Sequence, residues 1–100
     1  MTYDNKRTEI LTEAAELVNG RRQQEYGPPA TNFARIAAGW SVILGADVDV
    51  SAEQVSLCMA WLKIARIVGD GDASRDGVAS RDSYTDAAAY MALAGELADV

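Results

Sequence analysis

Two segments of this chain, residues 52–68 and 81–98, are apolar on more than one helical face. This feature restricts the possible folds more than any other. The first segment carries two separate stripes at helical spacing, which are Val55, Cys58, Met59, Leu62 and Ala65, and Leu57, Trp61, Ile64 and Val68. In the second segment, residues 87–94 are apolar without interruption. Because a helix that is apolar all round is buried on all sides, a 100-residue chain has too few elements to cover both. We therefore expect an all-α homo-oligomer, with Ala88, Met91 and Ala92 touching another chain.

The pattern along the chain predicts four helices and no strand, in one helical domain spanning residues 1–100. The expected helices cover about residues 4–18, a segment from Thr31 or Asn32 to Leu44, residues 52–68, and residues 81–98. Stop and start signals separate them. Asn19-Gly20 ends the first helix, Gly27-Pro28-Pro29 excludes a helix interior, and Ser51 with Gln54 has the form of a capping box. Residues 69–80 are rich in Gly, Asp and Ser and predict a flexible loop. The result is a helical bundle.

Composition excludes several classes of function. A net charge of −6 argues against a binder of duplex nucleic acid, which needs clustered Lys and Arg. The absence of histidine removes histidine-based acid–base catalysis, and the single Cys58 excludes an internal disulfide or a cysteine zinc site. No apolar run approaches the roughly 20 residues of a membrane span, and the charged start lacks a secretory signal. These features predict a cytoplasmic protein without a membrane partner.

Asp82 and Asp86 lie one helical turn apart, on a line that continues through Ala89, Tyr90, Leu93 and Leu97. A carboxylate on such an inward-facing line is costly unless a cation or a hydrogen-bond donor meets it. The helix before it has one polar pair in its interior, Lys63 and Arg66. If the two helices pack antiparallel, this pair lies beside Asp82 and Asp86. A purely structural interpretation is a satisfied polar network that fixes helix register.

The same cluster has a functional interpretation. Together with Arg22, Tyr26 and Asn32 from the preceding turn, Lys63 and Arg66 are suited to holding a phosphate-bearing ligand. Arginine offers planar bidentate donors to phosphate, and Tyr26 or Trp40 offers a stacking face for a base. Asp82 and Asp86 are equally suited to holding Mg²⁺ through one carboxylate each.

Three stretches, "RRQQEYGPPATNFARIAAGW", "CMAWLKIARI" and "DSYTDAAAYMAL", resemble small phage-encoded helical proteins described as MazG-like. The likeness extends from about Ile10 to Leu97. The matching positions are Arg22, Tyr26-Gly27, Asn32-Phe33, Lys63 to Arg66, and Asp82 to Tyr90. The resemblance implies a relation to the all-α nucleotide pyrophosphohydrolases, which use Mg²⁺ to split nucleoside triphosphates into monophosphate and pyrophosphate.

This chain departs from those enzymes at the metal-binding acids. They share a Glu-Glu-x-x-Glu pattern on one helix and Glu-x-x-Asp on the next. Here Asp82 and Asp86 are four residues apart, the preceding helix has only Glu53, and the acids of "TEAAE" (residues 12–16) lie two helices earlier. Because Mg²⁺-assisted phosphoryl transfer needs carboxylates to hold the ion, the pattern favours binding without hydrolysis or a metal cofactor.

Three functions remain open from the sequence. The preferred hypothesis is an oligomeric phage accessory protein that sequesters a nucleotide-type small molecule, such as a signalling nucleotide of host defence, in the host cytoplasm. The alternative is a Mg²⁺-dependent MazG-like pyrophosphohydrolase. The third is an interaction protein whose polar cluster only fixes helix register.

Overall fold

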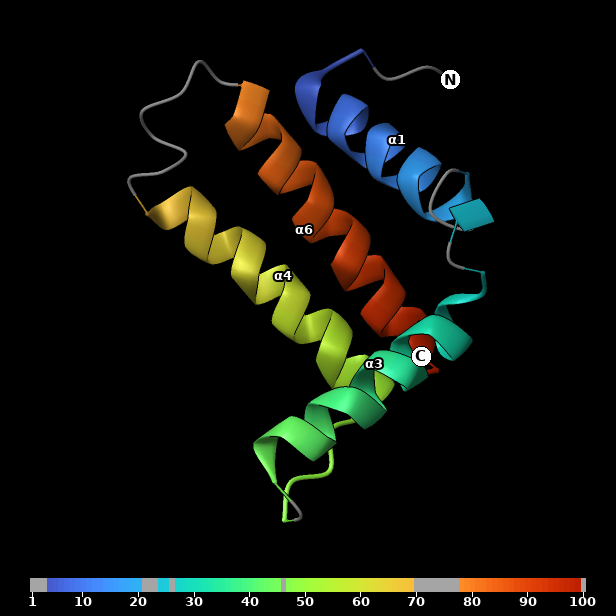
Figure 1. The fold of residues 1–100 in the computed structure, drawn as a ribbon. Coiled ribbons are helices and arrows are strands. Elements are labelled where there is room, and N and C mark those ends of the chain that lie inside the picture. Colours follow the sequence, from blue (N-terminus) through green and yellow to red (C-terminus); the bar gives the residue numbers. More distant parts are fainter. Residues whose placement is uncertain (1–3, 21–23, 26, 46, 70–77, 100) are drawn as a thin grey trace.

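The computed structural model describes residues 4–20, 24–25, 27–45, 47–69 and 78–99. Within these ranges the chain forms four helices and no strand, which confirms the all-α prediction. They are α1 (Lys6–Asn19), α3 (Pro29–Leu44), α4 (Ala52–Val68) and α6 (Val78–Leu97). Figure 1 shows α4 and α6 side by side and antiparallel, with α1 along the other flank of α6 and α3 crossing the start of α4.

The ends of α1 and α4 follow from local capping. Asn5 caps α1 by accepting a hydrogen bond from the backbone N–H of Thr8 at 2.9 Å. The Ser51 hydroxyl accepts from the backbone N–H of Gln54 at 3.1 Å, and the Gln54 side chain accepts from the Ser51 N–H at 2.9 Å. This reciprocal pair confirms the predicted capping box. It places the start of α4 at Ala52, and the helix ends at Val68, as predicted.

Two predicted helix starts were wrong. α3 begins at Pro29, before the predicted cap at Thr31 or Asn32, because a proline at the first helical position lacks only an N–H that would have no partner there. α6 begins at Val78 instead of Arg81, so the end of the predicted 69–80 loop is helical. Residues 70–77 of that loop lie outside the described residues.

The core lies where α3, α4 and α6 meet. Its buried side chains are Phe33, Ala37, Val55 and Leu93. The Phe33 ring meets the Tyr90 ring edge to face, with 6.4 Å between centroids, and the buried Ser56 hydroxyl donates to the Tyr90 carbonyl at 2.7 Å. The Ser56 hydrogen bond joins α4 to α6, and the Phe33–Tyr90 contact joins α3 to α6.

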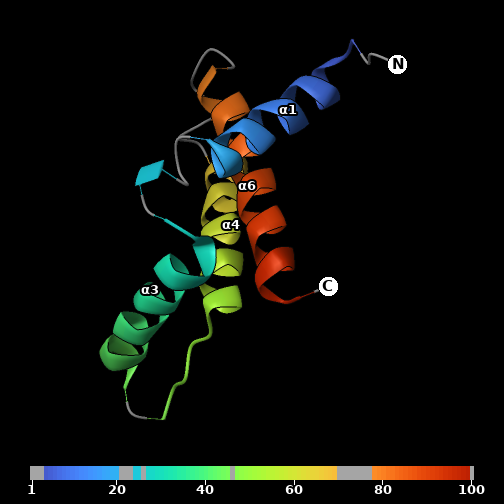
Figure 2. The ribbon, with the colours of Figure 1, turned by 90° about the vertical axis from the view of Figure 1, so that its right-hand side faces the viewer.

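Much apolar surface remains uncovered in this single chain, as the sequence predicted. On α4 the exposed large side chains are Leu57, Trp61, Leu62, Ile64 and Val68, and on α3 they are Val42, Ile43 and Leu44. Figure 2 shows why the end of α3 is uncovered, since this helix points away from the α4–α6 pair. Within the described part of the chain, no helix is both long and apolar enough to cross a bilayer.

Candidate acidic pocket between α1 and α6

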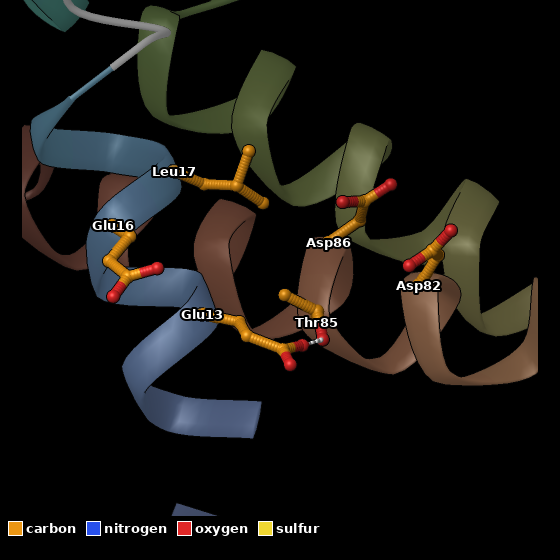
Figure 3. Close-up of a pocket in the computed structure, with 6 residues that line it drawn as sticks. All are labelled: Glu13, Glu16, Leu17, Asp82, Thr85 and Asp86. Atoms are coloured by element: carbon orange, nitrogen blue, oxygen red, sulfur yellow. Dashed lines mark hydrogen bonds between the residues drawn. The ribbon is translucent and has the colours of Figure 1, made fainter. Parts of the chain in front are cut away.

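A pocket of about 530 Å³ opens between α1 and α6 (Figure 3). Its lining side chains are Glu13, Glu16, Leu17, Asp82, Thr85 and Asp86. Four of these six residues are carboxylates, two from each helix. The volume is within the range of small-molecule pockets, roughly 300–1,000 Å³.

On the α1 side, Arg81 forms a clamp with two glutamates. Its Nη2 lies 2.6 Å from Glu13 Oε1 and 3.4 Å from Glu9 Oε2, and its Nε donates to Glu13 Oε2 at 3.4 Å. The Thr85 hydroxyl donates to Glu13 Oε2 at 3.2 Å. Glu9 and Glu13 are one turn apart on α1, and Arg81 and Thr85 are one turn apart on α6. One face of α1 that carries these two acids therefore contacts one face of α6 that carries Arg81 and Thr85.

The contact between Arg81 and Glu13 favours the charged form of both side chains. The hydrogen bond from Arg81 lowers the pKa of Glu13 below its ordinary value of 4.5, assisted by the bond from Thr85, while partial desolvation acts in the opposite direction. The same hydrogen bond raises the pKa of Arg81 above its ordinary value. At neutral pH Glu13, on the α1 wall of the pocket, is therefore the anion of an ion pair with Arg81.

On the α4 side, Lys63 Nζ lies 3.0 Å from Asp86 Oδ2. The Lys63 side chain is 16% exposed and that of Asp86 is 32% exposed, so the pair is largely covered by the α4–α6 interface. Figure 3 shows the carboxylates of Asp82 and Asp86 directed toward α4, whereas that of Glu13 is directed toward Thr85. The predicted contact between helices 52–68 and 81–98 is confirmed for Lys63 and Asp86.

The prediction for Asp82 was wrong. Asp82 is exposed, and among the described residues no ion pair joins it to Lys63 or Arg66, which is exposed as well. The buried polar side chains of α6 are instead Ser83 and Thr85.

Of the remaining predicted site residues, Arg22, Tyr26 and Asn32, the structure describes Asn32. Arg22 and Tyr26 lie outside the described residues. Asn32 is partly buried on the first turn of α3, beside Phe33, whose ring packs on Tyr90 one turn beyond Asp86. Asn32 is not among the residues that line the pocket.

Glu13 and Glu16 are pocket residues that the sequence prediction excluded because they lie two helices before α4, the helix on which the first acidic pattern was expected. The structure brings α1 directly against α6, so separation along the chain was a poor guide to distance. The four-residue spacings of Glu9 with Glu13 and of Arg81 with Thr85 are the sequence signal for this contact, and the sequence prediction did not use them.

The pocket carboxylates do not form a ready-made metal cage. Among the described residues, no group of three or more His, Cys, Asp or Glu side chains could hold a metal ion. Two of the four carboxylates already have cationic partners, Glu13 with Arg81 and Asp86 with Lys63. Glu16 and Asp82 carry no ion pair within the described parts of the chain, so the pocket is negative overall.

Comparison with known proteins gives a family but no activity. Residues 9–98 match the family described as "Domain of unknown function (DUF6378)". The chain is 40% identical over 81 residues to the Gene 55 protein of Mycobacterium phage D29, covering 81% of this chain and 48% of that protein. It is 42% identical over 62 residues to the Gene 55 protein of Mycobacterium phage L5, covering 62% of this chain and 39% of that protein. The chain thus spans about half or less of these curated relatives.

No solved structure matches the chain. The family match covers most of the chain, and both relatives are phage proteins. This chain therefore belongs to the DUF6378 family, a family with members in phages.

Proposed function

We propose that this chain is a phage accessory protein that binds a nucleotide-type phosphate ligand in the α1–α6 pocket without hydrolysing it. The observation that carries the proposal is the pocket itself, whose lining carboxylates Asp86 and Glu13 pair with Lys63 and Arg81 outside the lining. A pocket of about 530 Å³ has room for a nucleotide. The relatives' phage origin and the resemblance to MazG-like proteins support this class of ligand.

The charge of the pocket bears on how a phosphate would bind. Lys63 and Arg81 neutralise two of the lining carboxylates, which leaves Glu16 and Asp82 as lining carboxylates without an ion pair among the described residues. We therefore expect the ligand to bind with Mg²⁺, in contrast to the metal-free mode that the sequence favoured. Mg²⁺ is commonly held by one or two carboxylates plus the phosphates of its ligand, and Glu16 and Asp82 are the candidates here. The ion would offset the negative charge of the phosphates.

The enzyme remains the second candidate, and one observation favours it. Glu13 and Glu16 line the same pocket as Asp82 and Asp86, which restores four acids to one place. Binding without hydrolysis is preferred because Glu13 is engaged by Arg81 and Thr85 and Asp86 by Lys63, so two of the four acids are occupied.

Titration calorimetry of the full chain with ATP and with a cyclic dinucleotide, in Mg²⁺ and in EDTA, tests the proposal. We expect binding in Mg²⁺, loss of binding in EDTA, and recovery of intact nucleotide by chromatography. Glu16→Gln should weaken binding, whereas Glu96→Gln, an exposed acid near the other end of α6, should not. Failure of both nucleotides to bind would contradict the proposal. Pyrophosphate release that stops in EDTA would establish the enzyme instead.

Sequestration of a host-defence nucleotide is the biological role we propose for this binding, in the cytoplasm of the infected cell. The test is to recover the protein from infected cells, denature it, and identify released nucleotides by mass spectrometry. A protein that releases no nucleotide would count against sequestration. It would leave binding in vitro to be judged separately.

We also propose that the functional form is a homo-oligomer. The support is the apolar surface left exposed on α3 and α4, which is large for a chain of 100 residues. The mass of the protein in solution, measured by light scattering, tests this assembly independently of ligand binding.

A further inference from the structure

α1 supplies one wall of the α1–α6 pocket but is held to the rest of the molecule through a small interface. Three of the six lining residues, Glu13, Glu16 and Leu17, come from α1. Within the described part of the chain, α1 packs against α6 and against no other helix. Among the side chains of α1, which are all described, Ala14 alone is buried. The pocket therefore exists only while α1 is docked on α6, as Figure 3 shows it.

The attachment of α1 differs between its two ends. Near the end of the helix, Val18 is partly buried and packs against the core. Toward the start of the helix the attachment is polar and consists of Arg81 with Glu9 and Glu13, here called the Arg81 clamp. The Arg81 and Glu9 side chains are 36% and 50% exposed, so water competes with these contacts. The start of α1 is therefore the part that separates from α6 most readily while Val18 stays in place.

We propose that α1 is a movable wall of the pocket, so that ligand binding and the docking of α1 on α6 strengthen each other. This inference rests on the proposed function, because it concerns the regulation of the same pocket. A ligand that contacts both walls binds the docked form, so its apparent dissociation constant rises as the docked fraction falls. By the same coupling, the bound ligand increases the docked fraction. The Arg81 clamp sets how much of the free protein is docked.

Arg81 and Glu9 are positioning residues in this arrangement. Neither of them lines the pocket, so they act on the ligand through α1. Their charges are opposite, which separates this role from a direct electrostatic effect on an anionic nucleotide. Arg81→Gln removes a positive charge and Glu9→Gln removes a negative one, so direct electrostatics would change the affinity in opposite directions. Loss of the Arg81 clamp weakens binding in both variants.

Titration calorimetry on the full chain tests the role of the Arg81 clamp, with whichever of MgATP and the cyclic dinucleotide the wild type binds. We expect Arg81→Gln to raise the dissociation constant about fivefold or more, which is the lower range of coupling between sites. Glu9→Gln should raise it by a smaller factor, because Arg81 keeps its 2.6 Å contact with Glu13. Arg7→Gln, an exposed arginine of α1 outside the pocket lining, is the charge-matched control and should leave it unchanged. An unchanged or lowered constant in Arg81→Gln, or a lowered one in Glu9→Gln, would overturn the movable wall and leave nucleotide binding standing.

Hydrogen exchange gives a readout in the unmodified protein. Without ligand, the amides of α1 should exchange faster than those of α4, because the wall opens without the core. Saturating nucleotide with Mg²⁺ should slow exchange in α1 more than in α4. Exchange in α1 that is as slow as in α4 without ligand, or that bound nucleotide leaves unchanged, would overturn the movable wall even if Arg81→Gln failed to fold. A wild type that binds neither nucleotide would overturn the proposed function and the coupling with it.

Discussion

Single residues decide how the α4–α6 interface is held, and the pair of Lys63 and Asp86 is the clearest case. The pair is neither fully buried nor freely solvated. We expect Asp86→Asn to lower the free energy of unfolding by about 1–2 kcal/mol, between the values for surface and buried ion pairs. Urea denaturation of the wild type and of Asp86→Asn measures this loss in the free energy of unfolding.

A double-mutant cycle separates this pair from other effects of the substitution. If Lys63 and Asp86 interact as the structure shows, the losses in Lys63→Met and Asp86→Asn should not add in the double variant. Additive losses would mean that the 3.0 Å contact contributes nothing to stability.

The ionisation of Glu13 should make the stability of the fold depend on pH. Its pKa is lowered in the folded chain, so the unfolded chain binds the proton more tightly. The contribution of ionised Glu13 to the free energy of unfolding is present above the ordinary pKa of 4.5. It is lost as the pH falls through the lower pKa of the folded chain. Melting temperatures between about pH 6 and pH 3 should fall less steeply for Glu13→Gln than for the wild type. Equal slopes for Glu13→Gln and the wild type would mean that the Arg81–Glu13 ion pair does not set the pH dependence.

At the scale of elements, the capping box determines where α4 begins. Ser51→Ala removes the acceptor for the Gln54 N–H and should cost about 1 kcal/mol of stability. Ser51→Asp keeps an acceptor at the cap and should be nearly neutral. Equal losses in both variants, measured by thermal unfolding, would show that the cap does not limit the stability of α4.

The attachment of α1 should depend on Arg81. Among the described helices α1 packs against α6 alone, and Arg81 joins it through Glu9 and Glu13. In Arg81→Gln we expect faster hydrogen exchange across α1 and unchanged exchange in α4. Arg35→Gln, an exposed arginine on α3, is the control. Faster exchange throughout the molecule would mean that α1 and the core unfold together.

At the scale of the whole molecule, stability should depend on protein concentration. A chain that leaves Trp61, Val68, Val42 and Ile43 exposed gains stability when a second copy covers some of them. The melting temperature should therefore rise with concentration, since association favours the folded state by mass action. A wild-type melting temperature that does not change with protein concentration would contradict assembly.

The sequence alone determined the helices and most of their ends. The apolar period, the Asn19-Gly20 stop and the Ser51–Gln54 box are local signals, and local hydrogen bonds decide where a helix begins. The surplus of apolar surface and the meeting of Lys63 with Asp86 were also predictable, because a short loop makes neighbouring helices antiparallel.

Only the tertiary structure decided the composition of the pocket. Glu13 and Asp86 are distant along the chain, and they line one pocket because α1 packs on the flank of α6 opposite α4. Likewise, Asp82 and Asp86 have the four-residue spacing of a buried line, yet Asp82 is exposed while Ser83 beside it is buried. A helical period shows which residues share a face, but what covers that face is settled by the packing of every other helix.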